Sequence, residues 1–256
     1  MQYCFTVDDN IRFLKELTQQ QPEDMFSHPY LAMYRRLHEA HGVKVQLNLF
    51  YEMPGFTLSQ MTDRYRDQWQ ANAHWLKLSF HSRLENVRPY EFSGYDEVFS
   101  DCAAVHREIL RFAGPDSLGK TTTIHYCRNT VDGLKALRDQ GIQGLLGLYG
   151  TDEAPRVSYC VPEALAKSIR RGNTETFEGI RMGSIDMVIN TVPPAEMLPR
   201  LEALLPRQQL RVMIHEQYFY PDYRLYIPTF EEDLSRIFAF LKNQGFESHF
   251  YEEMLF

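Results

Sequence analysis

Short apolar runs and longer amphipathic stretches follow one another along the chain. Runs rich in β-branched and aromatic residues predict strands at 3–7, 43–50, 75–80, 121–126, 144–149, 185–190, 211–215 and 246–251. Between them, apolar residues recur every three or four positions, which predicts amphipathic helices, the clearest over 29–41, 95–113 and 230–243. Strands that alternate with helices predict a parallel sheet connected by crossover helices.

The number of these units favours a barrel. Seven or eight strand–helix units in 256 residues fit a (β/α) barrel better than an open sheet. Because no linker, internal repeat or low-complexity tract divides the chain, we expect residues 1–256 to form a single α/β domain. The least periodic stretch, 150–183, is expected to cover one mouth of the barrel with a short strand at 159–161 and a helix at 164–171.

Polar residues stand at the carboxyl ends of most predicted strands. They are Asp8, Asp9, Asn48, His81, His125, Tyr149, Asn190 and His215. In a barrel these ends converge on one face, where barrel enzymes place their chemistry. The set therefore predicts a metal site or an acid–base site on that face.

Asp8 and Asp9 follow the first predicted strand directly. Two adjacent carboxylates repel each other, and a metal ion would offset their charge, with one as ligand and the other free to act as a base. The alternative is that one of them only caps a helix that starts at residue 10 or 11.

Asp9 and His81 are suitable ligands for a borderline metal such as zinc. Three residues are candidates for the third ligand. Glu85 comes four residues after His81, so one turn of helix would place both on the same face. The others are His125, at the end of the fourth predicted strand, and His106, on the inner face of its helix. Alternatively, Glu85 pairs with a nearby surface arginine and His106 is a buried structural histidine.

His215 ends the late strand at 211–215 and is expected to face the site from the other side. An imidazole that binds no metal is suited to act as a general acid. The alternative is a core histidine hydrogen-bonded to Tyr218 or Tyr220.

The composition narrows the range of partners. The formal net charge is −7 and no long basic run occurs, so nucleic acid is not an expected partner. No stretch approaches the roughly 18 apolar residues that a membrane span needs, and no basic, apolar leader opens the chain. The four cysteines, Cys4, Cys102, Cys127 and Cys160, lack metal-type spacing and are expected to be reduced. Together these features predict a cytoplasmic protein; they predict no oligomeric state.

These residues, in this order, resemble the polysaccharide deacetylases of carbohydrate esterase family four. The first motif of that family is Thr-Phe-Asp-Asp-Gly, and residues 6–10 read Thr-Val-Asp-Asp-Asn. The second is His-Ser/Thr-x-x-His, and residues 81–85 read His-Ser-Arg-Leu-Glu. The family's late strand ending in a catalytic histidine is similar to residues 212–215, and its closing helix and last strand are similar to the chain's end.

The resemblance implies a distorted (β/α) barrel that removes N- or O-acetyl groups from a sugar with a divalent metal. By the motif match, Asp8 would be the catalytic base, His215 the acid, and Asp9 and His81 metal ligands. The metal would be zinc, with cobalt or nickel as alternatives. Residues expected to contact the substrate or to orient the ligands are Tyr90, His125, Asn190 and Tyr149. The substrate would be an acetylated sugar or a related small molecule, with a role in surface polysaccharide biosynthesis.

The sequence departs from the family at three places. Glu85 replaces the second histidine of the His-x-x-x-His motif, Asn10 replaces the glycine, and residues 122–126 stand where an Arg-Pro-Pro segment is expected. The resemblance is therefore to a divergent member. Two alternatives follow: another metal-dependent amide hydrolase on the same barrel, or a barrel that binds sugar and has lost catalysis.

Overall fold

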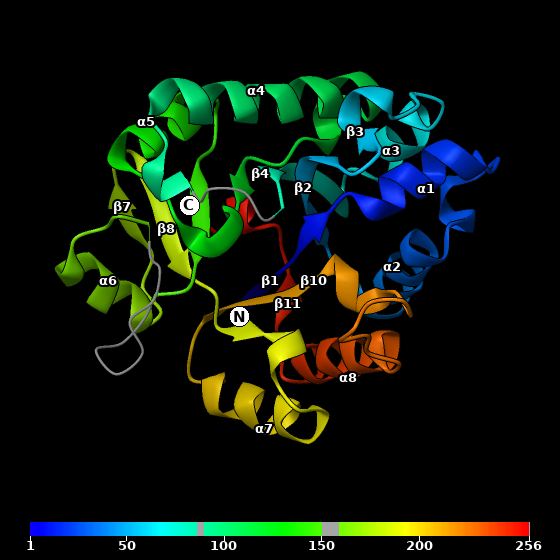
Figure 1. Ribbon diagram of the computed structural model, residues 1–256. Helices are drawn as coiled ribbons and strands as arrows, with labels where there is room; N and C mark the ends of the chain where they lie inside the picture. The colour runs from blue at the N-terminus through cyan, green and yellow to red at the C-terminus, as the bar shows by residue number, and fades with distance from the viewer. Residues whose placement is uncertain (86–89, 150–158, 256) are drawn as a thin grey trace.

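The computed structural model describes residues 1–85, 90–149 and 159–255, which form two β-sheets with helices around them (Figure 1). The larger sheet has seven strands and the smaller has four. The strands of the larger sheet are β1 (Gln2–Asn10), β2 (Val45–Met53), β3 (Phe56–Thr57), β4 (Leu76–Leu84), β9 (Met187–Val188), β10 (Gln209–His215) and β11 (Glu247–Ser248). Those of the smaller sheet are β5 (Thr121–Thr122), β6 (Gly144–Gly147), β7 (Glu175–Phe177) and β8 (Ile180–Ser184).

The described residues also form eight α-helices. They are α1 (Arg12–Gln20), α2 (Pro29–His41), α3 (Arg66–Asn72), α4 (Tyr95–Phe112), α5 (Val131–Asp139), α6 (Glu163–Arg170), α7 (Pro194–Leu204) and α8 (Phe230–Asn243). Short 3-10 helices are η1 (Met25–Ser27), η2 (Leu58–Gln60), η3 (Tyr90–Phe92), η4 (Pro115–Ser117), η5 (His125–Cys127), η6 (Ile189–Thr191), η7 (Glu216–Phe219) and η8 (Tyr251–Met254). In Figure 1, α4 crosses one side of the molecule, and α7 and α8 lie on the opposite side.

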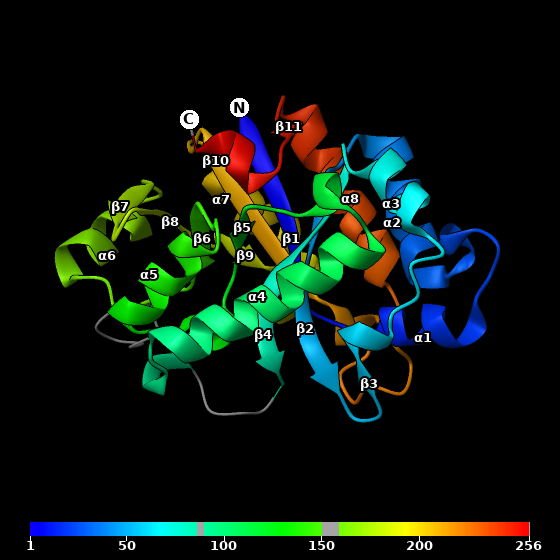
Figure 2. The ribbon, with the colours of Figure 1, turned by 90° about the horizontal axis from the view of Figure 1, so that it is seen from above.

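The centre of the larger sheet is the parallel pair of β1 and β10, which Figure 2 shows side by side. Both strands are buried over nearly their whole length, because helices cover the sheet on its outer face. For example, the ring of Phe5 contacts Phe238 of α8, with 5.0 Å between centroids, and Tyr34 of α2, with 6.1 Å. The register places Asp8 of β1 opposite His215 of β10.

The predicted α/β class and the distorted (β/α) barrel are confirmed, and the nature of the distortion is visible. Between β4 and β5, only an isolated parallel bridge joins Leu78 to Leu118, and Thr122 donates its hydroxyl to the carbonyl of Phe80. On the other side, β8 and β9 are not paired in the described part of the chain. The barrel is therefore not closed by strand ladders.

Three predicted strands are much shorter than expected. The strand predicted at 185–190 is reduced to β9, since the chain turns into η6 at Ile189, and Asn190 therefore lies on η6 and not at a strand end. The strand predicted at 121–126 ends after Thr122, and the chain turns into η5, where Tyr126 and Cys127 adopt left-handed backbone angles (φ 61° and 52°). His125 thus lies on a turn and not on a strand. The strand predicted at 246–251 is reduced to β11, since the chain turns into η8 at Tyr251.

The stretch 150–183, predicted to cover a barrel mouth, contains α6 and the β7–β8 hairpin. Residues 159–161 are not a strand, and the prediction for 150–158 falls outside the described residues. No helix of the described ranges combines the length and the apolar character of a membrane-spanning segment.

Candidate metal centre

A cavity of about 640 Å³ lies at the carboxyl ends of the central strands. Five of the polar strand-end residues identified in the sequence line it: Asp8, Asp9, His81, His125 and His215. They come from β1, β4, η5 and β10, so the cavity gathers residues that are more than 200 positions apart in the chain.

A backbone irregularity in β1 brings both aspartates into this cavity. In a regular strand, two successive side chains point to opposite faces. Here Asp9 has a left-handed conformation (φ 64°), and the pairing register with β2 shifts between Val7 and Asn10. Aspartate tolerates this conformation better than most residues do. The bulge therefore lets Asp8 and Asp9 line the same cavity.

The buried side chain of Asn10 fixes this bulge. Its Nδ2 donates to the carbonyl of Val7 at 2.6 Å and to that of Asn48 at 3.3 Å. Its Oδ1 accepts a hydrogen bond of 2.7 Å from the Tyr30 hydroxyl. The residue that departs from the family motif thus connects backbone carbonyls of β1 and β2 at the bulge to Tyr30 of α2.

Three side-chain atoms converge in the cavity. The Nε2 atom of His81 lies 3.0 Å from Asp9 Oδ1 and 3.1 Å from His125 Nδ1, and Asp9 Oδ1 lies 3.3 Å from His125 Nδ1. We call Asp9, His81 and His125 the metal triad. Two neighbouring ligands of a zinc-sized ion are about 3.0–3.4 Å apart when each is bound at about 2.1 Å. The spacing of the triad therefore fits a single ion.

The hydrogen bonds of His81 direct a lone pair into the triad. Its Nδ1 donates to the carbonyl of Thr123 at 2.5 Å, so in the neutral ring Nε2 is an acceptor that faces the acceptor oxygen of Asp9. Two acceptor atoms that face each other at this distance need a proton or a cation between them. One carboxylate oxygen and two imidazole nitrogens form a ligand set that suits zinc, cobalt or nickel. The residues present thus fit the metal that the resemblance implies.

The charges of the triad also favour a cation. Burial opposes ionisation of Asp9, but the neighbouring imidazole rings of His125 and His81 hold the pKa of this carboxyl well below its usual value. Burial likewise opposes a charge on His81, but the carboxylates of Asp8 and Asp9 raise the pKa of the imidazole. The site therefore keeps Asp9 ionised and attracts positive charge.

Neighbouring side chains orient the triad. Gln217 donates from Nε2 to Asp9 Oδ2 at 2.8 Å, which leaves Oδ1 toward the histidines. The ring of Phe50 contacts those of His81 and His125 edge-on, with centroid distances of 5.1 and 5.0 Å. Sequence reasoning missed both roles, because Gln217 lies beyond the strand predicted at 211–215 and Phe50, the last residue of the strand predicted at 43–50, is apolar.

Asp8 lies beside the triad and is 2% exposed. Asn48 donates to Asp8 Oδ1 at 2.7 Å, and Gln46 donates in turn to Asn48 Oδ1 at 2.8 Å. Burial raises the pKa of Asp8, although the nearby His81 and His215 lower it. A carboxylate with a raised pKa accepts a proton more readily than an exposed one does.

His215 faces Asp8 across the β1–β10 pair. Its Nδ1 lies 2.8 Å from Asn190 Oδ1, which can only accept, so Nδ1 carries a proton. The other ring nitrogen, Nε2, is left for the cavity. An imidazole held in this way can exchange a proton with a bound molecule at Nε2.

The remaining candidates have other surroundings. Glu85 is exposed and lines the same cavity, but it is not in the triad. His106 is buried on α4, with Nε2 3.6 Å from Cys102 Sγ, and is outside the cavity lining. Asn190 holds His215, as described.

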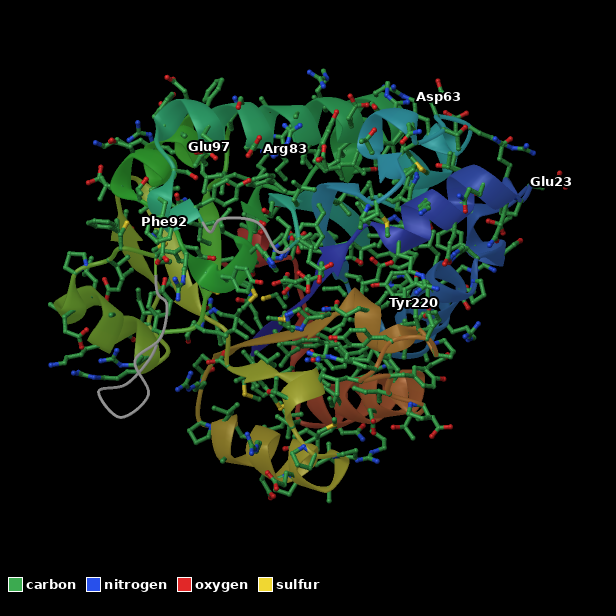
Figure 3. The ribbon with its side chains drawn as sticks, viewed as in Figure 1. Glu23, Asp63, Arg83, Phe92, Glu97 and Tyr220 are labelled. Carbon is green, nitrogen blue, oxygen red and sulfur yellow. The ribbon has the colours of Figure 1, made fainter. Side chains whose placement is uncertain are left out.

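Tyr90 and Tyr149 lie outside the cavity lining. The Tyr90 hydroxyl donates to Asp101 Oδ2 at 3.0 Å and accepts from the backbone of Arg83, a residue that lies beside α4 (Figure 3). Tyr149 is buried against the ring of Tyr159, with 6.5 Å between centroids. Both tyrosines support the elements around the cavity.

Comparisons with known proteins show that this chain is similar in fold to several solved structures. No protein-family model and no curated protein matches the sequence. The crystal structure of 4-alpha-glucanotransferase from Thermococcus litoralis matches with a TM-score of 0.64 and 13% identity, over 100% of this chain and 40% of that chain. A structure from Mycobacterium smegmatis, assigned as a polysaccharide deacetylase, matches with a TM-score of 0.56 and 11% identity, over 98% of this chain and 87% of that one.

The chain thus spans 40% of the length of the glucanotransferase and nearly all of the assigned deacetylase. At these identities the likeness concerns the fold. The fold that the motif resemblance implied, a divergent polysaccharide-deacetylase-like barrel, is the fold of this chain.

Proposed function

We propose that this protein is a metal-dependent hydrolase that removes an acyl group, acetyl in the simplest case, from an acylated sugar. The observation that carries the proposal is the convergence of Asp9, His81 and His125 beside two further titratable groups, Asp8 and His215. The barrel fold shared with a structure assigned as a polysaccharide deacetylase supports it.

Each residue has a definite part in such a reaction. Asp9, His81 and His125 would hold a divalent cation, which supplies Lewis-acid chemistry toward a water molecule and a carbonyl group. Asp8 accepts the proton of the attacking water, whose oxygen forms a bond to the acyl carbon. His215 donates a proton from Nε2 to the departing nitrogen or oxygen of the sugar as the acyl bond breaks. Asn190 keeps the imidazole in the required orientation.

Metal content is the first test. We expect mass spectrometry of protein purified without chelator to find about one zinc, cobalt or nickel ion per chain. His81→Ala and His125→Ala should both lose the ion. His74→Ala changes an exposed histidine between α3 and β4 and should keep it. If the wild-type protein binds none of the three metals even after soaking, the chain is a sugar-binding barrel without this chemistry.

The choice of substrate distinguishes this proposal from the second alternative, another metal-dependent amide hydrolase. Release of acetate from N- or O-acetylated sugars by the metal-loaded protein, abolished by chelation, is the expected result. Hydrolysis of small amides with no activity on acylated sugars would instead assign the site to another C–N hydrolase.

A further inference from the structure

The cavity beside the metal triad has two walls of different chemistry. One wall carries the ionisable groups already described. The other carries six aliphatic residues, Leu148, Ile185, Met187, Val188, Val192 and Met213. We call this second part of the cavity the aliphatic lobe.

The aliphatic lobe lies where the two sheets are not joined. Leu148 follows β6, Ile185 connects β8 to β9, and Met213 belongs to β10. β8 and β9 share no ladder in the described part of the chain, and the segment between them is held by backbone hydrogen bonds from Ile185 to Gly147 and from Asp186 to Arg211. Ile185 and Met213 belong to a smaller hydrophobic cluster that includes Leu146, Met254 and Leu255. Packing in this cluster holds the two side chains in place.

The charged residues near the lobe do not make it polar. The side chain of Asp186 is 0% exposed and pairs with Arg207 and Arg211, and its Oδ2 accepts from the backbone nitrogen of Arg211 at 2.8 Å. Arg200 is half-exposed and pairs with Glu196 at 2.7 Å. These charges are therefore neutralised by their own partners beside the lobe.

A sugar ring is a poor occupant for such a surface. It carries hydroxyl groups on most of its carbons, and each hydroxyl buried against aliphatic carbon without a partner costs free energy. An acetyl group offers a single methyl, which one or two side chains can cover. We propose, building on the proposed function, that the aliphatic lobe binds an acyl chain of several methylene groups, so that the substrate is a sugar with an acyl group longer than acetyl.

Binding measured without turnover tests this inference. The probes are glucosamine and its N-acetyl, N-butanoyl, N-hexanoyl and N-octanoyl derivatives, titrated calorimetrically into the full chain below their micelle concentrations. The chelator-treated and the metal-loaded protein are both used. We expect affinity to rise by about fourfold for each added methylene until the lobe is full. Equal affinities from acetyl to octanoyl would overturn the proposal.

Substitutions in the lobe locate the effect. Val192→Phe fills part of the lobe and should abolish the gain with chain length while N-acetylglucosamine binds as before. Val188→Phe, at a half-buried position, makes the same test if Val192→Phe does not fold. Leu110→Phe, on the exposed face of α4, is the matched control and should keep the wild-type dependence. If the affinity of both lobe variants depended on acyl chain length as it does in the wild type, the acyl chain would bind elsewhere. That result would contradict the inference.

The hydrolysis assay distinguishes the two proposals. Affinity that rises with chain length, without hydrolysis of any derivative by the metal-loaded protein, keeps the acyl site and refutes the proposed function. Hydrolysis of the acetyl derivative with no dependence of affinity on chain length keeps the function and refutes the acyl site.

Discussion

Asp9 shapes the site through its backbone as well as through its carboxylate. Its left-handed conformation interrupts the alternation of β1, and only this interruption lets two neighbouring aspartates share a cavity. The sequence showed the pair of carboxylates but not the bulge, because φ is not encoded in a hydrophobic pattern. The role of Asn10 depends on this bulge, so the sequence pattern could not predict that role either.

Asn10→Ala should weaken both the fold and the metal centre. The change removes the two donors to backbone carbonyls and leaves the buried Tyr30 hydroxyl without its acceptor. We expect a loss of about 2–3 kcal/mol in the free energy of unfolding by urea and a metal affinity lower by about tenfold or more. Tyr30→Phe removes only one of the three hydrogen bonds and should cost less in both measurements. If Asn10→Ala left the metal affinity unchanged, metal binding by the triad would not depend on the hydrogen bonds that hold the bulge.

Asp8→Asn should separate metal binding from catalysis. Asparagine keeps the size of the side chain but cannot accept the proton of a water molecule, and Asp8 is outside the triad. We expect full metal content by mass spectrometry and a fall of about 10²–10⁴-fold in kcat. Asp9→Asn, the matched change in the neighbouring residue, should lose the metal instead. Full activity in Asp8→Asn would remove this residue from the mechanism.

At the scale of the elements, the start of α1 depends on a residue some 200 positions away. Ile11, at the N-cap of this helix, offers no side-chain cap. Instead the buried carboxylate of Glu216 on η7 accepts from the backbone nitrogens of Ile11, Arg12 and Phe13, at 2.7, 3.1 and 2.8 Å. It also accepts from the hydroxyl of Tyr220, which lies near α2 in Figure 3. This contact fixes α1 against the strand end that carries His215.

Glu216→Ala should destabilise the protein by about 3 kcal/mol, because three helix N–H groups lose their acceptor. Burial raises the pKa of Glu216 to about 7, so the folded state favours the protonated carboxyl and the contribution of this residue to stability falls as the pH rises toward 7. The measurement is therefore best made below pH 7. Glu216→Gln keeps one acceptor oxygen and should cost less. Chemical unfolding that gives equal stabilities for the wild type and Glu216→Ala would show that water replaces the cap.

The elements also show what a sequence pattern can and cannot predict. The long strands and helices were predictable, since β1, β2, β4 and β10 are buried apolar runs and α2, α4 and α8 have clear apolar faces. The turn that carries His125 was not, because two consecutive left-handed residues that are not glycine leave no signal in the periodicity. The third member of the triad was therefore one of three candidates in the sequence. Only the fold brings His125 next to Asp9.

At the scale of the whole molecule, buried ionisable groups outside the site affect stability at low pH. His106 is buried on α4 with the Cys102 thiol beside it, and burial lowers the pKa of its imidazole to about 4. An unfolded histidine binds a proton below about pH 6.5. Between these two values the unfolded chain takes up a proton that the folded chain does not, so folding becomes less favourable as the pH falls.

The contribution of His106 can be isolated with His106→Gln, which does not titrate. We expect the stability of the wild type relative to this variant to fall by about 3 kcal/mol as the pH decreases from 6.5 to 4. Urea unfolding at several pH values measures the difference. A difference that does not change with pH would mean that His106 is protonated equally in the folded and unfolded chains.

Because the barrel is open, a metal ion in the triad would also affect how firmly the two sheets are held together. Asp9 and His81 belong to the seven-stranded sheet, whereas His125 follows the first strand of the four-stranded sheet. An ion held by all three would fasten together two halves of the molecule that share no ladder in the described part of the chain. The free energy of metal binding then adds to the cohesion between the halves, and chelation would speed amide exchange in β6 and β8 more than in β1 and β10. The supply of metal would set how long the chain survives proteolysis, whether or not a substrate is present.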